Sequence, residues 1–220
     1  MFIGIDLGTS GVKTILIDEN QNTLSSVTKK IELQNPSPGF YEQNPESWYN
    51  ATIKCFAKIK EDKPKEFGVV KSIGISGQMH GATLIDKKNK VLRPCILWND
   101  TRSMKQCIEM EKQLPYLRKI SGNIAMPGFT APKILWIKEN ESENFKKIYK
   151  VLLPKDYLRF RLSGSFFTDM SDASGTLWLN VEKREWSDKL LNLSLLSKDH
   201  MPGLVEGSDP TPSLKKKLAN

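Results

Sequence analysis

Long hydrophobic runs are missing from this 220-residue chain, and cysteine is scarce. No apolar stretch reaches the roughly 20 residues that a membrane-spanning helix needs, and the start, Met1-Phe2-Ile3, lacks the basic segment of a secretory signal peptide. The three cysteines, Cys55, Cys95 and Cys107, are odd in number and form no Cys-x-x-Cys pair. We therefore expect free thiols in a reducing, cytoplasmic setting, without a disulfide framework or a cysteine metal site.

Positive charge is in excess, but it is dispersed. The 33 lysines and arginines against 25 acidic residues give a net charge of +8. The lysines stand in short, separate groups such as 87–88 and 215–217, whereas nucleic-acid binding calls for clustered arginine with interleaved aromatic residues. We therefore expect neither a nucleic acid nor a membrane as partner, and a phosphorylated small molecule can use the positive potential equally well.

The most informative motif is Gly4-Ile5-Asp6-Leu7-Gly8-Thr9-Ser10-Gly11 near the N-terminus. It predicts two short apolar strands joined by a Gly-Thr-Ser-Gly turn, which is a hairpin signal. Glycine permits positive φ and close approach, so the amides and hydroxyls of the turn can bind phosphate. The predicted phosphate-binding residues are Gly8, Thr9, Ser10, Gly11 and Lys13. Asp6 suits such a site only with Mg²⁺ between carboxylate and phosphate, and we expect it to hold the metal through water.

Two better-known phosphate motifs do not fit this segment. A Walker A loop requires Gly-Lys-Ser/Thr at its end, whereas Lys13 follows Val12. A dinucleotide fingerprint opens a helix, whereas Gly11 opens a second strand. The remaining alternative is an ordinary edge hairpin in which Asp6 is simply solvated.

The rest of the chain predicts an α/β domain with a mixed sheet. Expected strands cover residues 23–33, 69–75, 82–85, 91–98 and 151–153. One expected helix runs from the Asn44-Pro45 cap to before Pro64, and a second runs from Asn99-Asp100 to about residue 114. A third begins after a Thr130 cap. The last two cover residues 155–162 and, after Ser187, residues 188–196. Residues 34–44 are expected to form a loop, and residues 207–220 a linker or C-terminal stub after a domain spanning 1–206.

Two polar loops follow apolar strands and carry groups suited to hydroxyl recognition. Gln78, Met79 and His80 stand between glycines, and Trp98, Asn99 and Asp100 combine an aromatic face with an amide and a carboxylate. Polyols are commonly bound this way, by polar groups on the hydroxyls and an aromatic surface under the C–H face. The structural alternatives are a turn whose histidine satisfies a carbonyl, and a helix N-cap at Asn99-Asp100. The polar segment 169–176 predicts only a capped turn.

The motifs, taken together and in order, resemble the FGGY family of carbohydrate kinases. They are Gly4–Gly11, Gly77–Gly81, Ile96–Arg102, Gly128–Lys133, Leu153–Leu158 and Ser171–Gly175. The Gln-Met-His-Gly loop resembles that of the members that act on D-xylulose, because glycerol kinases carry Arg-Glu at the Met79 and His80 positions. The similarity extends over residues 1 to about 206.

The resemblance implies an actin-like, ribonuclease-H-like fold and transfer of phosphate from ATP, with Mg²⁺, to the terminal hydroxyl of D-xylulose. It assigns Asp6 to metal and phosphate organisation, and it assigns Gln78, Met79, His80, Trp98, Asn99 and Asp100 to the sugar pocket. Similar kinases are about twice as long. The catalytic aspartate and the C-terminal ATP-binding domain have no match in this sequence, so we expect the chain alone to lack turnover.

Two other functions remain open on the sequence. One alternative is that the chain belongs to a kinase of another sugar or polyol, such as ribulose, gluconate or glycerol. The other is that it is a sugar-binding module without turnover. Because the second half of the kinase is missing, part of an interdomain face is expected to be exposed, and self-association into a homodimer is a further expectation.

Overall fold

The computed structural model describes residues 1–219, which form two compact units. Unit 1 comprises Met1–Leu33 and Asn44–Gln78, and unit 2 comprises Gln34–Gln43 and the chain from Met79 onward. Within the part of the chain that the structure describes, no helix combines the length and apolar character needed to cross a membrane.

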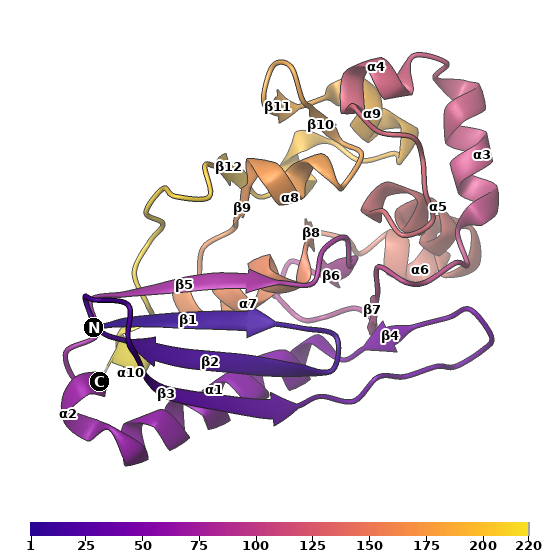
Figure 1. Cartoon of the computed structure of the whole chain (residues 1–220). Coiled ribbons are helices and arrows are strands. Elements are labelled where there is room, and N and C mark those ends of the chain that lie inside the picture. Colours follow the sequence, from indigo (N-terminus) through magenta and orange to yellow (C-terminus); the bar gives the residue numbers. More distant parts are fainter. Residues whose placement is uncertain (220) are drawn as a thin grey trace. The chain divides into compact units, whose positions relative to one another are not determined.

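Unit 1 is built on a four-stranded sheet with the order β3-β2-β1-β5 (Figure 1). Its strands are β1 (Phe2–Leu7), β2 (Gly11–Ile17), β3 (Thr23–Lys30) and β5 (Ser72–Gly77). The pairs β1–β2 and β2–β3 are antiparallel, whereas β5 runs parallel to β1. The predicted hairpin and the predicted mixed sheet are therefore confirmed.

Helix α1 (Pro45–Asp62) covers one face of this sheet by packing on β2 and β3. The Asn44 side chain accepts a hydrogen bond from the Glu46 amide at 3.0 Å, and Pro45 occupies the first turn, as the sequence predicted. The apolar stripe of α1 is buried through Trp48, Ala51, Cys55 and Ile59. The helix ends before Pro64, which starts the short α2 (Pro64–Phe67).

Strand β5 differs from the buried strand predicted over residues 69–75. Val69 and Val70 donate their amides to the last turn of α2, so the strand begins only at Ser72. Val69 is 59% exposed, and the side chains of β5 alternate between exposed and half-buried. The strand thus begins three residues later than predicted and ends two residues later, at Gly77 rather than Ile75.

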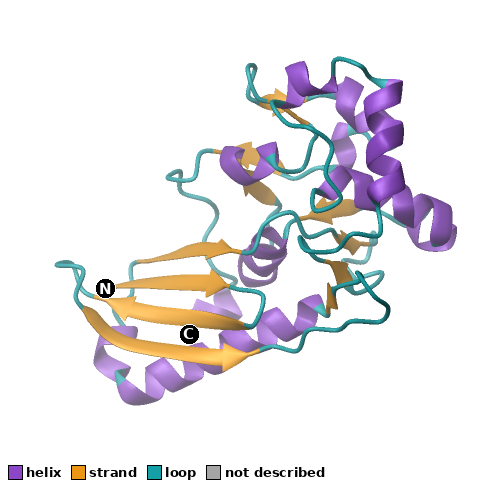
Figure 2. Cartoon of the chain, turned by 45° about the vertical axis from the view of Figure 1, so that its right-hand side comes forward, coloured by secondary structure: helices purple, strands orange, loops and turns teal. Residues whose placement is uncertain are grey.

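Unit 2 combines short paired strands with short helices (Figure 2). The antiparallel pairs are β4 (Glu42–Gln43) with β7 (Cys95–Ile96), β6 (Thr83–Ile85) with β8 (Lys150–Leu152), and β10 (Leu179–Asn180) with β11 (Glu185–Trp186). The parallel pair is β9 (Phe167–Asp169) with β12 (Gly203–Val205). The helices are α3 (Met104–Gln113), α4 (Leu117–Ser121), α5 (Thr130–Asn140), α6 (Ser142–Phe145), α7 (Pro154–Ser163), α8 (Met170–Ser174), α9 (Asp188–Leu193), the 3₁₀ turn η1 (Lys198–His200) and α10 (Lys216–Ala219).

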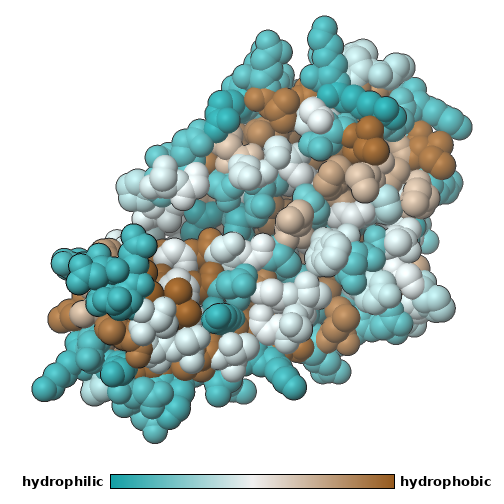
Figure 3. Space-filling model, viewed as in Figure 1, coloured by the Kyte–Doolittle hydropathy of each residue, from teal (hydrophilic) through white to brown (hydrophobic). Residues whose placement is uncertain are grey.

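The core of unit 2 is apolar, and its buried indoles are hydrogen-bonded. Trp178 and Trp186 donate their ring N–H groups to the Ser194 hydroxyl at 3.0 Å and the Pro202 carbonyl at 2.9 Å. At the surface, Met104 and Ile108 of α3 are each 52% exposed. Figure 3 shows that the hydrophobic side chains in this region lie in patches between hydrophilic ones.

Several predicted boundaries in unit 2 are wrong. The strand expected over 91–98 is only the two-residue β7, and the expected loop 34–44 contains its partner β4. The helix expected after Asn99-Asp100 starts at Met104. Helix α5 starts at Thr130 itself, after Phe129 as N-cap. In the predicted stub, the Lys215 amide donates to the Leu162 carbonyl at 2.9 Å, so this segment contacts α7.

A pair of glycines in β5 tests the packing of the sheet of unit 1. A Cβ at Gly77 would lie 2.9 Å from both Cβ and the carbonyl oxygen of Leu7, whereas a Cβ at Gly74 would meet nothing within 4 Å. We expect Gly77→Ala to lower the free energy of unfolding by about 2 kcal/mol, and Gly74→Ala to change it by less than about 0.5 kcal/mol. Urea titration of both variants measures this, and equal destabilisation would contradict the assigned register.

Candidate functional site

The predicted metal and phosphate residues of unit 1 lie on neighbouring strands. Asp6 of β1 is paired with Lys13 of β2 and with Ser76 of β5, so these three residues form a row across the sheet. All three are exposed. Side chains of directly paired residues point to the same face of a sheet. The row therefore presents a carboxylate, an ammonium group and a hydroxyl on one solvent-facing side.

The Gly-Thr-Ser-Gly turn is tight, and of the two predicted reasons for glycine the structure supports close approach and not positive φ. The Gly8 amide donates to the Gly11 carbonyl at 2.9 Å and closes the turn. Neither glycine has a positive φ, which corrects the sequence interpretation. A Cβ at Gly11 would lie 2.9 Å from the Lys29 carbonyl oxygen of β3. Glycine is thus required here because the strand backbones approach closely.

The same edge of the sheet carries the first residue of the second motif. The Gln78 amide donates to the Leu7 carbonyl at 2.7 Å, and the Thr9 hydroxyl donates to Gln78 Oε1 at 3.3 Å. This contact arises because β1 and β5 are parallel, so that their carboxyl ends meet. The structure therefore joins the predicted phosphate turn to the predicted sugar-binding Gln78.

In unit 2, His80 has an unusual and closely surrounded conformation. Its φ is +64°, a left-handed value that costs a non-glycine residue about 1–2 kcal/mol. The imidazole contacts the Phe129 ring edge-on, with 4.7 Å between centroids. A Cβ at Gly175 would lie 2.2 Å from His80 Cε1, so the ring rests on the glycine backbone. Within residues 1–219, buried His80 Nδ1 has no hydrogen-bond partner.

The other predicted sugar residues of unit 2 are divided between exposed apolar groups and buried polar ones. Met79 is 49% exposed and Trp98 is 46% exposed. The side-chain oxygen of Asn99 is buried and accepts no hydrogen bond from the described residues. Such orphaned atoms are rare in folded proteins and call for an explanation.

Asp100 is buried, and both of its carboxylate oxygens already accept hydrogen bonds from the protein. One oxygen accepts hydrogen bonds from the Arg102 amide and Nε, both at 2.9 Å, and the other accepts from an Arg102 terminal nitrogen at 2.7 Å and the Tyr41 amide at 2.6 Å. This occupancy explains why Asp100 does not cap α3, whose N-cap is Ser103. Asp100 is thus a positioning residue for the 98–102 loop, and its contact with a ligand stays a prediction.

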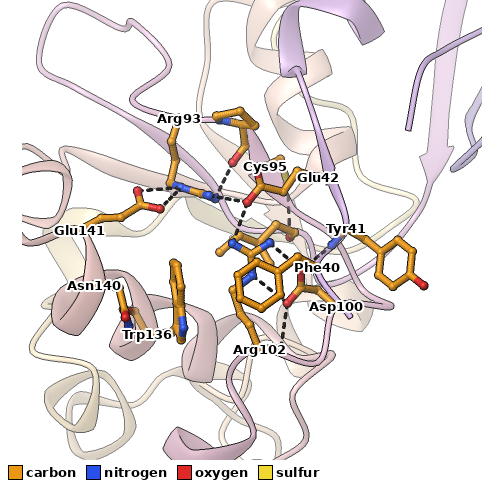
Figure 4. A network of polar contacts seen from close by, with 12 residues as sticks. Phe40, Tyr41, Glu42, Arg93, Cys95, Asp100, Arg102, Trp136, Asn140 and Glu141 are labelled. Carbon is orange, nitrogen blue, oxygen red and sulfur yellow. Dashed lines mark hydrogen bonds and ion pairs between the residues drawn. The ribbon is translucent and has the colours of Figure 1, made fainter. Parts of the chain in front are cut away.

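Asp100 belongs to a buried ion network that the sequence reading missed (Figure 4). Glu42 Oε1 accepts from Arg93 at 2.6 Å and from Arg102 at 2.7 Å, and Arg93 also binds Glu141 at 2.8 Å. The Arg102 guanidinium lies over the Phe40 ring, 3.9 Å from its centroid. Asp100 and Arg102 share one motif, but Glu42, Arg93 and Glu141 come from distant parts of the sequence, so only the fold brings the network together.

The segment 169–176 is also more than a capped turn. Asp169 does cap α8, because its carboxylate accepts from the Asp172 amide at 3.0 Å. The Lys155 ammonium group lies 2.7 Å from Asp169 and 3.1 Å from Asp172, and it also binds Asp156. Burial opposes the charge, but these carboxylates outweigh it and raise the pKa of Lys155. The ion cluster thus fixes the segment whose Gly175 supports His80.

Removing one partner from the buried network should be strongly destabilising. Glu42→Gln replaces the carboxylate that two buried guanidinium groups share with a neutral amide, while Arg93 keeps Glu141 and Arg102 keeps Asp100. We therefore expect a loss of about 2–3 kcal/mol in the free energy of unfolding. Glu143→Gln is the matched control, because the side chain of Glu143 is 74% exposed in its pair with Lys146, and we expect it to have no measurable effect. Denaturant unfolding of both variants measures these losses, and a small effect of Glu42→Gln would contradict the buried pairing.

His80 should make stability depend on pH in the acidic range. Burial, and then the charge of Lys133, lower the pKa of His80 from 6.5 to about 4. The unfolded chain therefore binds more protons at this histidine between these values, so the contribution of His80 to stability is constant above about pH 6.5 and falls as the pH approaches 4. Allowing for solvent screening of a half-buried ring, the loss is about 1–2 kcal/mol.

Urea unfolding at several pH values measures this loss, with His80→Asn and, as control, His200→Asn. The acid-dependent loss should shrink in the first variant and persist in the second. An unchanged pH profile in His80→Asn would show that His80 is not the responsible group.

Comparisons with known proteins agree with this architecture. The family model described as the FGGY family of carbohydrate kinases, N-terminal domain, matches residues 1–220. A protein of Escherichia coli strain K12 described as a xylulose kinase is 51% identical over 219 residues, covering 100% of this chain and 45% of that protein. The chain thus spans about half the length of the curated relatives it matches.

Two solved structures show the same fold. The structure of a xyloylose kinase from Brucella ovis has a TM-score of 0.97 at 49% identity and covers 99% of this chain and 45% of that one. A gluconate kinase from Lactobacillus acidophilus has a TM-score of 0.91 at 25% identity, covering 98% and 44%. The fold is accordingly the actin-like one that the sequence motifs implied. The chain belongs to the FGGY family of carbohydrate kinases.

Proposed function

We propose that this chain is the N-terminal, sugar-binding part of a kinase that transfers phosphate from ATP to D-xylulose. The observation that carries the proposal is its high identity to xylulose kinases along its whole length, 51% for the Escherichia coli protein. Xylulose kinases of Klebsiella pneumoniae and Bacillus subtilis are likewise 50% and 46% identical to this chain. Since the chain spans 45% of the Escherichia coli protein, the catalytic base and the nucleotide-binding surface would come from a C-terminal domain.

The sugar side of the proposal rests on the two loops of unit 2. Exposed Met79 and Trp98 offer apolar surface for the C–H face of a sugar, and an aromatic ring suits this role. The unpartnered Asn99 Oδ1 and His80 Nδ1 lie in the same loops and can pair with hydroxyl groups once a ligand rearranges their surroundings. Burial and the charge of Lys133 keep the pKa of His80 at about 4, so the imidazole is neutral at physiological pH.

The phosphate side of the proposal rests on unit 1. The turn from Gly8 to Gly11 presents backbone amides, Thr9 and Ser10 add hydroxyls, and Lys13 adds a charge beside Asp6. The described residues hold no cluster of three or more acidic, histidine or cysteine side chains that could bind a metal. A single exposed carboxylate still fits Mg²⁺, which keeps several waters and takes its remaining ligands from phosphate. Asp6 would hold the ion through water, and the ion would neutralise phosphate charge.

The organisation of the whole protein follows as part of the proposal. Residues 1–206 would form the sugar-binding domain, and residues 207–220 would lead toward the C-terminal domain. The buried thiols of Cys55, Cys95 and Cys107 suit a reducing cytoplasm. Self-association of the chain stays a prediction.

Binding of sugars to the 220-residue chain tests the proposal directly. We expect D-xylulose to bind with a Kd of about 1 mM or weaker, because only part of the binding cleft is present, and to bind more tightly than ribulose, gluconate or glycerol. Trp98→Ala should weaken binding several-fold through loss of stacking. Leu195→Ala, at a 55% exposed apolar residue of the same unit, is the matched control and should have no effect. NMR titration with each sugar measures all of these.

Two results would change the assignment. A stronger response to gluconate or glycerol than to D-xylulose would replace the sugar. Turnover with ATP well above a trace by the chain alone would show that the catalytic base lies within it, because general-base assistance contributes about 10²–10⁴-fold to such rates.

A further inference from the structure

Lys133, in the first turn of α5, is a fully buried cation that no part of the proposed mechanism uses. Its ammonium group donates to the His80 carbonyl at 3.0 Å and to the Gly128 carbonyl at 2.6 Å. Neither acceptor carries a formal charge. Burial of a charge on such partners is costly, and here burial lowers the pKa of Lys133 to about 7 although Cys95 and Asp100 act in the opposite direction. Packing alone would be served equally well by an uncharged side chain.

One carbonyl that Lys133 binds belongs to the first predicted sugar loop, and the other belongs to the segment that contacts the second loop. The His80 carbonyl also accepts from the Thr130 hydroxyl at 3.1 Å, so two side chains of α5 hold one carbonyl oxygen. These two hydrogen bonds restrain His80, the residue whose φ is +64°. A carbonyl fixed on one side by two donors resists the rotation that would relax the backbone to an ordinary conformation.

The hydrogen bond from Lys133 to the Gly128 carbonyl restrains the loop of Trp98 as well. A Cβ at Gly128 would lie 2.6 Å from the Trp98 carbonyl oxygen, so the backbones of Gly128 and Trp98 are in direct contact. Lys133 fixes the Gly128 carbonyl, and through it the support on which Trp98 rests. One ammonium group is therefore bonded to the loop of His80 and to the segment that supports Trp98.

The first turn of α5 fixes the third motif as well. The Ala131 amide donates to the Thr176 carbonyl at 3.1 Å, and Gly175 next to it lies under the His80 ring. The His80 loop, the Trp98 loop and the segment 171–176 thus all contact residues 128–133. This convergence gives the Gly128–Lys133 motif a physical reason within the fold.

We propose that Lys133 is a positioning residue that fixes His80 and Trp98 in the geometry in which they bind the sugar. The proposal rests on the proposed function for its ligand, but the arrangement of His80 that it explains exists without ligand. The competing interpretation is that Lys133 only stabilises the core of unit 2.

Lys150 supplies a matched control for this distinction. Its ammonium group also bridges two backbone carbonyls, those of Asp199 and Met201, at 2.8 and 2.9 Å. Burial lowers the pKa of Lys150 too. Lys150→Met and Lys133→Met therefore remove the same kind of bond, and only the second removes it from beneath the predicted sugar loops.

NMR of the 220-residue chain provides the readouts, and the presence of only two histidines simplifies assignment. Backbone chemical shifts and couplings of His80 report whether its φ is still positive, and D-xylulose titration reports affinity. In Lys133→Met we expect His80 to lose its left-handed signature and binding to weaken about tenfold or more. In Lys150→Met both readouts should match the unmodified chain, although stability falls.

The outcomes separate this proposal from the proposed function. If Lys133→Met keeps the His80 signature and binds as Lys150→Met does, Lys133 has only a structural role and the proposal is overturned. If the unmodified chain binds no sugar, the proposed function fails, while the His80 signature still tests the role of Lys133. Should Lys133→Met not fold, Thr130→Val removes the other donor. Thr130→Val must then disturb His80 and Thr130→Ser restore it, and an unaffected His80 would refute the hold on its carbonyl.

Discussion

The arrangement of unit 2 depends on one constraint, which is that charges removed from water must find partners. Arg102 is almost fully buried, and it is satisfied only because Asp100 and Glu42 meet it from two different segments. Arg93 then binds the same Glu42 oxygen and continues the network to Glu141. Removing one partner takes a charged hydrogen-bond partner away from a buried group, which is costly. The network therefore fixes the path of the 98–102 loop more strictly than apolar packing, which tolerates substitution of similar volume.

Unit 1 achieves its precision by a different physical means. Its turn and strand ends are positioned by backbone contact, which only glycine permits at Gly11 and Gly77. No buried charge is required there, so Asp6 and Lys13 stay exposed on the row that faces solvent. Exposed charges retain their hydration and can exchange it for an anion or a hydrated metal ion at small cost. The two units thus place polar groups by opposite strategies.

The parts of the fold that follow local rules could be predicted from the sequence. The β1–β2 hairpin, the Asn44-capped α1 and the helix expected over 155–162, which is α7, each depend on neighbouring residues, and all three are confirmed. The start of α3 was wrong because Asp100, a good local cap, is claimed by Arg102 and by the distant Tyr41 amide. The same contacts make Asp100 a positioning residue of its loop, which its place in the motif does not indicate. Partners 59 residues apart leave no trace in spacing or periodicity.

A sequence motif does not distinguish residues that can contact a ligand from residues that only position them. In Trp98-Asn99-Asp100, the structure leaves the indole 46% exposed while the carboxylate is 1% exposed. In Gly128–Lys133, Thr130 and Lys133 are buried and donate hydrogen bonds to the carbonyl of the strained His80. Residues that contact a ligand need surface, whereas residues that position them need burial and fixed hydrogen bonds. Specificity for one sugar over another should therefore change most at Met79 and Trp98.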